Sequence, residues 1–202
     1  MVTEVASIRE YRERFPITWG IAVLLLGIMV LDVAGKIITG AESWNPWIGV
    51  GQEVSLSDDP YRVVTYAFFH FNWLHLAANV MAILVMGAWM ESCFPLRWYL
   101  GLFLGGIVGA GLAVWIWQTG TVVGSSGFGF ALLGVGTMFF LWDRTMIEPP
   151  VQSFMIGLCI VGWPLTFLTP FASIAGHVGG FLAGILVGGL YIIIQPDKKS
   201  AG

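Results

Sequence analysis

A few polar side chains in otherwise apolar sequence have the residue types and spacing of a serine hydrolase. Gly124-Ser125-Ser126-Gly127 supplies two hydroxyl groups, and His177 follows in a later apolar segment. Serine is a weak nucleophile that needs a neighbouring base, for which His177 is the candidate. His75 and Asn79 are four residues apart and share one helix face. These two side chains, together with free backbone N–H groups at the start of a helix, could donate hydrogen bonds to an oxyanion. No carboxylate is evident at this depth, so the pattern favours a Ser-His dyad over a triad.

Each of these residues also has a simpler explanation when taken alone. A Gly-Ser-Ser-Gly stretch in a membrane helix is typical of close packing, and Asn79 could join two helices by a hydrogen bond. A metal site built from His70, His75, His177 and Glu91 is a further alternative, since histidine is a common ligand. It is disfavoured because His70 and His75 would lie about 140° apart on a helix, and Glu91 is expected at the opposite membrane face. We therefore expect no metal and no other cofactor.

The composition indicates the class of protein that must position these groups. Of 202 residues, 57% are hydrophobic and only 10% are charged, whereas a soluble domain carries about 25% charged residues. This excludes an ordinary soluble domain and a disordered chain. The net charge of -3 offers no basic face to phosphates, so no nucleic-acid partner is expected.

The charges mark the ends of the membrane-spanning elements. Four long uncharged stretches, of 17, 28, 45 and 48 residues, begin after Arg14, Arg62, Arg97 and Glu148. A bilayer span needs about 20 mostly apolar residues, so the first two stretches fit one helix each and the last two fit two each. We predict an all-α polytopic membrane protein. Its six transmembrane helices lie near 17–38, 65–90, 96–117, 124–141, 150–168 and 172–194.

The orientation of the bundle follows from lysine and arginine. With an even number of spans, both termini share one side, and that side collects Arg9, Arg12, Arg14, Arg97, Arg144, Lys198 and Lys199. By the positive-inside rule it is the cytoplasm. The predicted organisation is a cytoplasmic segment over 1–16, a six-helix membrane domain over 17–195 and a cytoplasmic tail over 196–202, with an extracytoplasmic first loop over 39–64. This organisation puts both serines and every histidine in the outer halves of spans two, four and six.

Several features of the sequence other than the serines, the histidines and Asn79 allow more than one interpretation. The first span could be a cleaved signal peptide, but no convincing small-x-small cleavage site follows it. The first loop, rich in Trp, Pro and Gly, could lie in the membrane interface or form a surface cap. Asp32 and Lys36 can pair at their four-residue spacing, and Cys93 and Cys159 are expected to be free thiols.

Three short motifs together resemble the rhomboid family of intramembrane serine proteases. They are His70-Phe-Asn-Trp-Leu-His75-Leu-Ala-Ala-Asn79, Gly124-Ser125-Ser126-Gly127, and His177 followed by Gly180 and Gly184. The resemblance covers roughly residues 60–190 and agrees with the count of six spans. It implies cleavage of single-span transmembrane proteins, near the extracytoplasmic face of a lipid bilayer, by a multi-pass protein of the bacterial inner membrane.

The resemblance also assigns roles to individual residues. Ser126 aligns with the nucleophile, His177 with the general base, and His75 and Asn79 with the oxyanion donors. Supporting positions are His70, Phe130, Gly124, Gly127, Gly180, Gly184, Arg62 and Glu91. The alternative is a non-proteolytic rhomboid-like protein that binds transmembrane helices. Such pseudoenzymes usually lack the serine or the histidine, and this chain has both.

Three positions depart from the family pattern. Tyr61 precedes Arg62 where the family has Trp, and Cys93 replaces the Arg of a Glu-x-Arg motif that starts at Glu91. Phe130 stands where a Tyr often packs on the base histidine, so the ring is kept and the hydroxyl is lost. Neither the change at Cys93 nor the change at Phe130 touches an atom that the implied chemistry requires.

Glycines recur every four residues on two spans, at 101, 105 and 109 and at 180, 184 and 188. Such stripes let helices approach closely. The second stripe would hold His177 against span four. General packing and a homodimer face are the alternatives.

Overall fold

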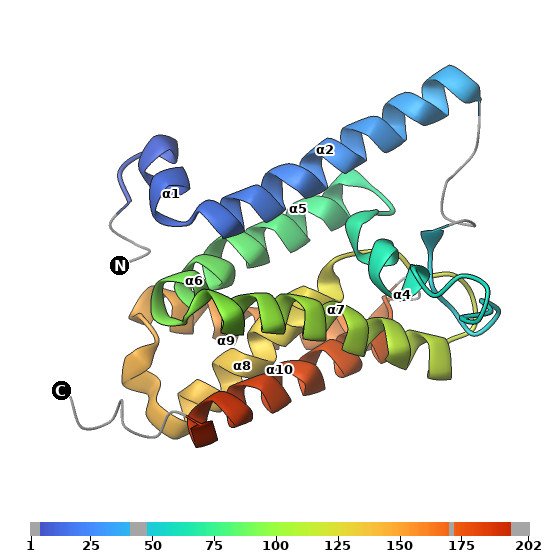
Figure 1. The fold of residues 1–202 in the computed structure, drawn as a ribbon. Coiled ribbons are helices and arrows are strands. Elements are labelled where there is room, and N and C mark those ends of the chain that lie inside the picture. The colour runs from blue at the N-terminus through green and yellow to red at the C-terminus, as the bar shows by residue number, and fades with distance from the viewer. Residues whose placement is uncertain (1–4, 41–47, 170–171, 195–202) are drawn as a thin grey trace.

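The computed structural model describes residues 5–40, 48–169 and 172–194, and this part of the chain is mainly helical (Figure 1). The helices are α1 (Ile8–Arg14), α2 (Pro16–Thr39), α4 (Arg62–Thr65), α5 (Trp73–Ala82), α6 (Ala88–Cys93), α7 (Leu96–Trp117), α8 (Ser126–Asp143), α9 (Pro149–Leu168) and α10 (Ile174–Ile194). Short 3-10 turns are η2 (Tyr66–Phe68) and η4 (Arg144–Met146), and a π-helical turn, η3 (Ile83–Gly87), joins α5 to α6.

Six helices are long and apolar enough to cross a membrane: α2, the continuous α5–η3–α6 helix, α7, α8 with η4, α9 and α10. The predicted six-helix fold class is therefore confirmed. The predicted tail over 196–202 lies outside the described residues, as do residues 41–47 of the predicted first loop.

The prediction for the second span is wrong at its beginning. The helix expected over 65–90 starts only at Trp73, after a separate helical segment over 62–68 and a non-helical stretch over 69–72. The extended backbone of Asn72 explains the break, because its side chain accepts a hydrogen bond from the His75 N–H at 2.8 Å and caps the helix. His70 and Asn72 therefore precede the span, and the helical-wheel separation of His70 from His75 does not apply. Similarly, α4 takes in the last residues of the loop predicted over 39–64.

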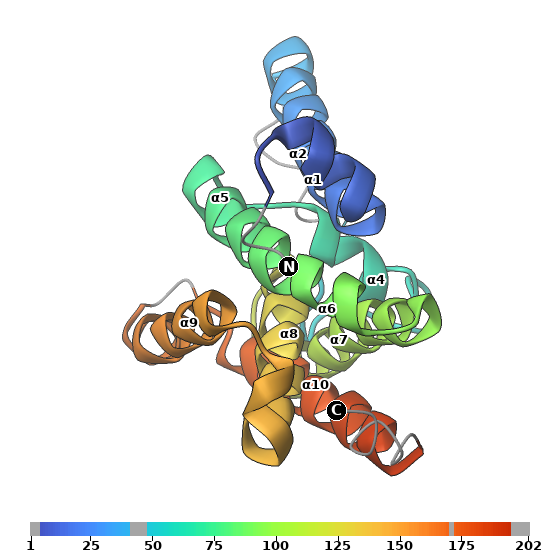
Figure 2. The same ribbon diagram turned by 90° about the vertical axis from the view of Figure 1, so that its left-hand side faces the viewer.

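The three helices α7, α8 and α10 form the most closely packed part of the bundle. Figure 2 shows α8 in the middle, with α9 on one side and α7 on the other. In Figure 1, α2 rests on α5 and α6, and α1 and the end of α10 lie at the same end of the bundle. The first and last described helices reach the same end of the bundle because the chain crosses it an even number of times.

Glycine makes the contact between α8 and α10 possible. A Cβ at Gly180 would overlap the backbone carbonyl of Gly127, and one at Gly184 would overlap that of Ala131. On α7, Gly109 lies against Ala183 and Gly179 of α10, whereas Gly101 has open space around it. The predicted stripe on α10 therefore packs on α8, and the stripe on α7 contacts α10 only in part.

Two features outside the site also match their predictions. Asp32 and Lys36 form an ion pair on α2, with the Asp32 side chain buried. Cys93, at the end of α6, and Cys159, within α9, form no disulfide in the part of the chain that the structure describes.

Candidate active site

The N-terminal ends of α5, α8 and α10 meet at one end of the bundle. Ser126 is the first residue of α8, and His177 lies on the first turn of α10. The Nε2 atom of His177 is 3.0 Å from the Ser126 Oγ atom, and both side chains are partly exposed. This is the spacing at which an imidazole can take a proton from a serine hydroxyl.

The turn before Ser126 requires glycine. Gly124 has a backbone φ of 136°, a value that residues other than glycine rarely adopt. A Cβ at this position would lie 2.5 Å from Cε1 of the His75 ring. The Gly124 N–H donates to the Tyr66 carbonyl at 3.0 Å. The backbone therefore passes close to the His75 ring at Gly124, two residues before Ser126 begins α8.

His177 is held on its ring face and on its far nitrogen. The Phe130 ring stacks on the imidazole with a centroid distance of 4.1 Å and an interplanar angle of 12°. The Nδ1 atom lies 2.7 Å from the Thr166 Oγ1 atom on α9. Two neighbouring spans thus contact this imidazole of α10, because Ser126 and Phe130 belong to α8 and Thr166 to α9.

The second serine of the motif belongs to a separate buried pair. Ser125 and His70 are each only 2% exposed, and the Ser125 Oγ atom is 3.1 Å from the His70 Nε2 atom. The Ser125 backbone N–H also points to that nitrogen, at 3.3 Å. Burial, together with the neighbouring His75, lowers the pKa of His70 to about 3. His70 is therefore uncharged at neutral pH and contacts the turn rather than Ser126.

His75 and Asn79 lie on the first two turns of α5, on the side that faces α8. The His75 ring packs against Gly124, and the Asn79 side-chain oxygen approaches Gly129. Asn79 is buried, and its amide donates to the His75 carbonyl at 3.0 Å. Both polar side chains therefore lie beside the start of α8, where free backbone N–H groups are also available.

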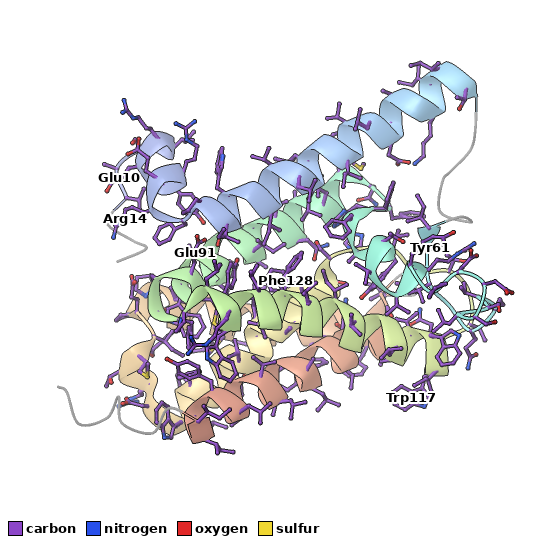
Figure 3. The ribbon with its side chains drawn as sticks, viewed as in Figure 1. Glu10, Arg14, Tyr61, Glu91, Trp117 and Phe128 are labelled. Carbon is purple, nitrogen blue, oxygen red and sulfur yellow. The ribbon has the colours of Figure 1, made fainter. Side chains whose placement is uncertain are left out.

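The remaining predicted positions divide into packing contacts and distant residues. Gly127 of α8 and Gly180 of α10 touch each other, and one helical turn further along both helices Gly184 touches Ala131. Arg62 lies on α4 and pairs with Asp59 at 2.6 Å. Glu91 lies at the other end of the bundle from Tyr61, near the start of α2 (Figure 3).

Glu91 caps a helix instead of joining the histidines. Its carboxylate accepts the backbone N–H groups of Ile17 and Thr18 at 2.9 and 2.8 Å. Within residues 5–40, 48–169 and 172–194, no group of three or more His, Cys, Asp or Glu side chains could hold a metal ion. The four-residue metal set considered from the sequence is thus not assembled.

Comparison with known proteins decides the family. The model of the Rhomboid domain matches residues 57–194, more than half of the chain. The chain belongs to the Rhomboid family. Rhomboid relatives include rhomboid-like protease 3 of Toxoplasma gondii, 31% identical over 62% of this chain and 49% of the relative. RHOMBOID-like protein 6, mitochondrial, of Arabidopsis thaliana is 25% identical over 73% of this chain and 48% of the relative. Rhomboid protease GluP of Bacillus subtilis is 24% identical over 90% of this chain and 36% of the relative.

This rhomboid chain spans about half the length of the first two of these relatives, and less of the third. Two of the departures from the family pattern lie at different ends of the bundle, Phe130 beside His177 and Cys93 at the end of α6. Phe130 stacks on His177 without a hydroxyl. Cys93 ends α6 beside Ser92, with its sulfur 3.5 Å from the Ser92 Oγ atom.

Sequence reasoning did not identify Thr166 as part of this rhomboid site. A threonine inside a span usually satisfies its hydroxyl on its own helix, so Thr166 stands out from its apolar neighbours far less than a histidine does. The cap at Asn72 and the positive φ of Gly124 were also missed. A turn-forming Asn three residues before His75 was the available signal for the cap.

Proposed function

We propose that this chain is an intramembrane serine protease in which Ser126 is the nucleophile and His177 is the general base. The observation that carries the proposal is the 3.0 Å contact between Ser126 Oγ and His177 Nε2 at the meeting point of α8 and α10. The names of the relatives from Toxoplasma gondii and Bacillus subtilis, which are rhomboid-like or rhomboid proteases, support it. Single-span transmembrane proteins in a lipid bilayer are the proposed substrates, and no cofactor takes part.

The first chemical step forms an acyl-enzyme. Ser126 Oγ attacks the scissile carbonyl carbon while His177 Nε2 takes the hydroxyl proton. The carbonyl oxygen becomes an oxyanion beside the start of α8. The Ser126 backbone N–H, which has no partner within the helix at this position, then donates to the oxyanion together with His75 and Asn79.

The second step releases both products. His177 returns its proton to the leaving amine as the peptide C–N bond breaks, and a water molecule then hydrolyses the ester at Ser126. A substrate helix satisfies its own backbone hydrogen bonds in the bilayer, so it must unwind locally before its carbonyl can reach Ser126. Helix-breaking or small residues near the cleaved bond favour this unwinding.

The proposed orientation has both termini in the cytoplasm of a bacterial cell and the Ser126 end of the bundle facing outward. The distribution of lysine and arginine along the sequence supports it. Reporter domains fused to the C-terminus and to the loop between α7 and α8 test it. An enzyme reporter that works only in the cytoplasm is expected to be active at the first position and inactive at the second.

Cleavage of a single-span substrate in proteoliposomes tests the mechanism. Ser126→Ala and His177→Ala are both expected to abolish cleavage, and Ser153→Ala, on the exposed start of α9, is expected to cleave like the wild type. Full activity of either site variant overturns the mechanism, and residual activity of Ser126→Ala alone assigns the attack to Ser125. A mechanism-based serine reagent should label Ser126. A folded protein that binds transmembrane helices without labelling or cleavage would instead be a non-proteolytic member of the family.

A further inference from the structure

The Thr166 hydroxyl makes two hydrogen bonds, and only one assignment of its proton satisfies both. Thr166 is 1% exposed. Its Oγ1 atom lies 2.7 Å from the Gly162 carbonyl oxygen and 2.7 Å from His177 Nδ1. A carbonyl oxygen can only accept, and a hydroxyl has a single proton to give. The hydroxyl therefore donates to Gly162 and accepts from Nδ1–H of His177.

This assignment determines which nitrogen of His177 is the base. In a neutral imidazole one nitrogen carries the proton and the other accepts. With the proton on Nδ1, the lone pair of Nε2 points to Ser126 Oγ at 3.0 Å, which is the arrangement needed to take the serine proton. We infer that Thr166 is a positioning residue that selects the reactive tautomer of His177. This inference rests on the proposed function.

In triads the corresponding place is held by a carboxylate, and the setting of α9 explains why a hydroxyl takes it here. The sequence of α9, Pro149–Leu168, contains no Asp, Glu, Lys or Arg. An ionised carboxylate at this depth would lose its hydration. A hydroxyl is less costly to bury, because it also satisfies itself on its own helix through Gly162.

The proton balance keeps Thr166 outside the covalent chemistry. When Ser126 loses its proton to Nε2, the imidazole becomes a cation with a proton on each nitrogen. Nδ1–H continues to donate to Thr166 Oγ1, and the Thr166 proton stays on Oγ1, from which it is donated to the Gly162 carbonyl. The hydroxyl thus stabilises the cation through its dipole. A hydrogen bond to a charged group is worth a factor of about 10 to 100 in rate.

Two substitutions and one matched control separate this role from general packing. Thr166→Val keeps the shape and removes the acceptor, and Thr166→Ser restores a hydroxyl. Thr169→Val is the control, because Thr169 Oγ1 donates to the Leu165 carbonyl at 2.7 Å in the same helical pattern without a contact to an imidazole among the described interactions. In the cleavage assay, we expect kcat to fall by about 10- to 100-fold in Thr166→Val with little change in KM. Thr166→Ser and Thr169→Val should stay near the wild-type rate.

Nitrogen NMR of isotope-labelled histidine gives a readout that packing alone would not move. The chain has only three histidines, and the His177 signal is the one that disappears in His177→Gln. At neutral pH, His177 should carry its proton on Nδ1 in the wild type and in Thr166→Ser, and should lose this preference in Thr166→Val. The inference is overturned if wild-type His177 is protonated on Nε2. It is also overturned if Thr166→Val leaves the tautomer or kcat unchanged.

Failure of the proposed function would look different. In that case Ser126→Ala cleaves as well as the wild type, whatever the tautomer of His177. If Ser126→Ala is inactive while Thr166→Val matches the wild type, the dyad stands and only the role of Thr166 is rejected.

Discussion

Gly184 of α10 lies against the backbone carbonyl of Ala131 in α8, so closely that a Cβ at Gly184 would overlap the carbonyl oxygen. One turn earlier, Gly180 touches the Gly127 carbonyl in the same way. These contacts bring the two helix backbones together within two turns of His177. The separation of α8 from α10 is therefore coupled to the distance between Ser126 and His177, the proposed catalytic residues.

A methyl group at Gly184 should push the two helices apart. We expect Gly184→Ala to lower kcat/KM by about 100-fold, the effect of a misplacement near 1 Å, and to destabilise the fold by about 1–3 kcal/mol. Gly189→Ala on the same helix is the matched control, because its Cβ would meet only the end of Met138 at an ordinary 3.8 Å. Equal cleavage by the two variants in proteoliposomes would contradict this role of the stripe.

The Phe130 ring should matter more than any hydroxyl at its position. Because it stacks on His177 at 4.1 Å, Phe130→Ala frees the imidazole to tilt and is expected to reduce kcat by about two- to tenfold, the range for one aromatic pair. Phe130→Tyr should keep the rate. Phe167→Ala is the control, since Phe167 is 60% exposed and stacks on Trp163 instead. A Phe130→Ala variant with full activity would show that the stack is dispensable.

Loss of the Asn79 side chain should weaken turnover without abolishing it. In the proposed mechanism it is one of several donors to the oxyanion, and loss of one such donor costs about 10²–10³ in kcat. We expect Asn79→Ala to show this loss with KM nearly unchanged, because the interaction forms in the transition state. Rates should be compared by single-turnover cleavage. A loss confined to KM would assign Asn79 to substrate binding instead.

Glu91 should stabilise the fold from the end of the bundle that lies away from Ser126. It supplies the cap of α2, whose own N-cap residue, Phe15, makes no side-chain hydrogen bond. Removal of a helix cap costs about 1–2 kcal/mol, so Glu91→Ala should unfold at a lower temperature in detergent and retain its kcat below that temperature. Glu13→Ala is the control, since it breaks only an exposed pair with Arg9 worth less than about 1 kcal/mol. Equal unfolding temperatures for the two variants would contradict the capping role.

The loop contact between Glu53 and Gly120 should depend on pH. The Gly120 N–H donates to both carboxylate oxygens, at 3.0 and 3.2 Å, and this bond lowers the pKa of Glu53. A lowered pKa means that the contact is fully formed above the ordinary glutamate value of about 4.3 and is lost as the pH falls through the lowered value. The Gly120 amide signal in NMR should titrate with a midpoint below that ordinary value. In Glu53→Gln the signal should not move over this range, and a midpoint at or above the ordinary value would refute the contact.

The sequence by itself determined the number of spans and placed Ser126 and His177 near the starts of two of them. Charged side chains are excluded from the bilayer core, so Arg14, Arg97 and Glu148 mark helix ends without any knowledge of the fold. The same cost makes Ser126 and His177 conspicuous in apolar sequence. Their meeting at one end of the bundle follows from an even alternation of spans.

Only the tertiary structure decided which polar groups pair. Span positions do not state how each helix is rotated or which helices are neighbours, because close packing between distant segments sets both. His70 therefore bonds to Ser125 through Nε2 while its ring packs edge-on against His75, and Glu91 caps α2. Thr166 reaches His177 because α9 packs beside α10, a relation between two helices that hydropathy along one chain does not encode.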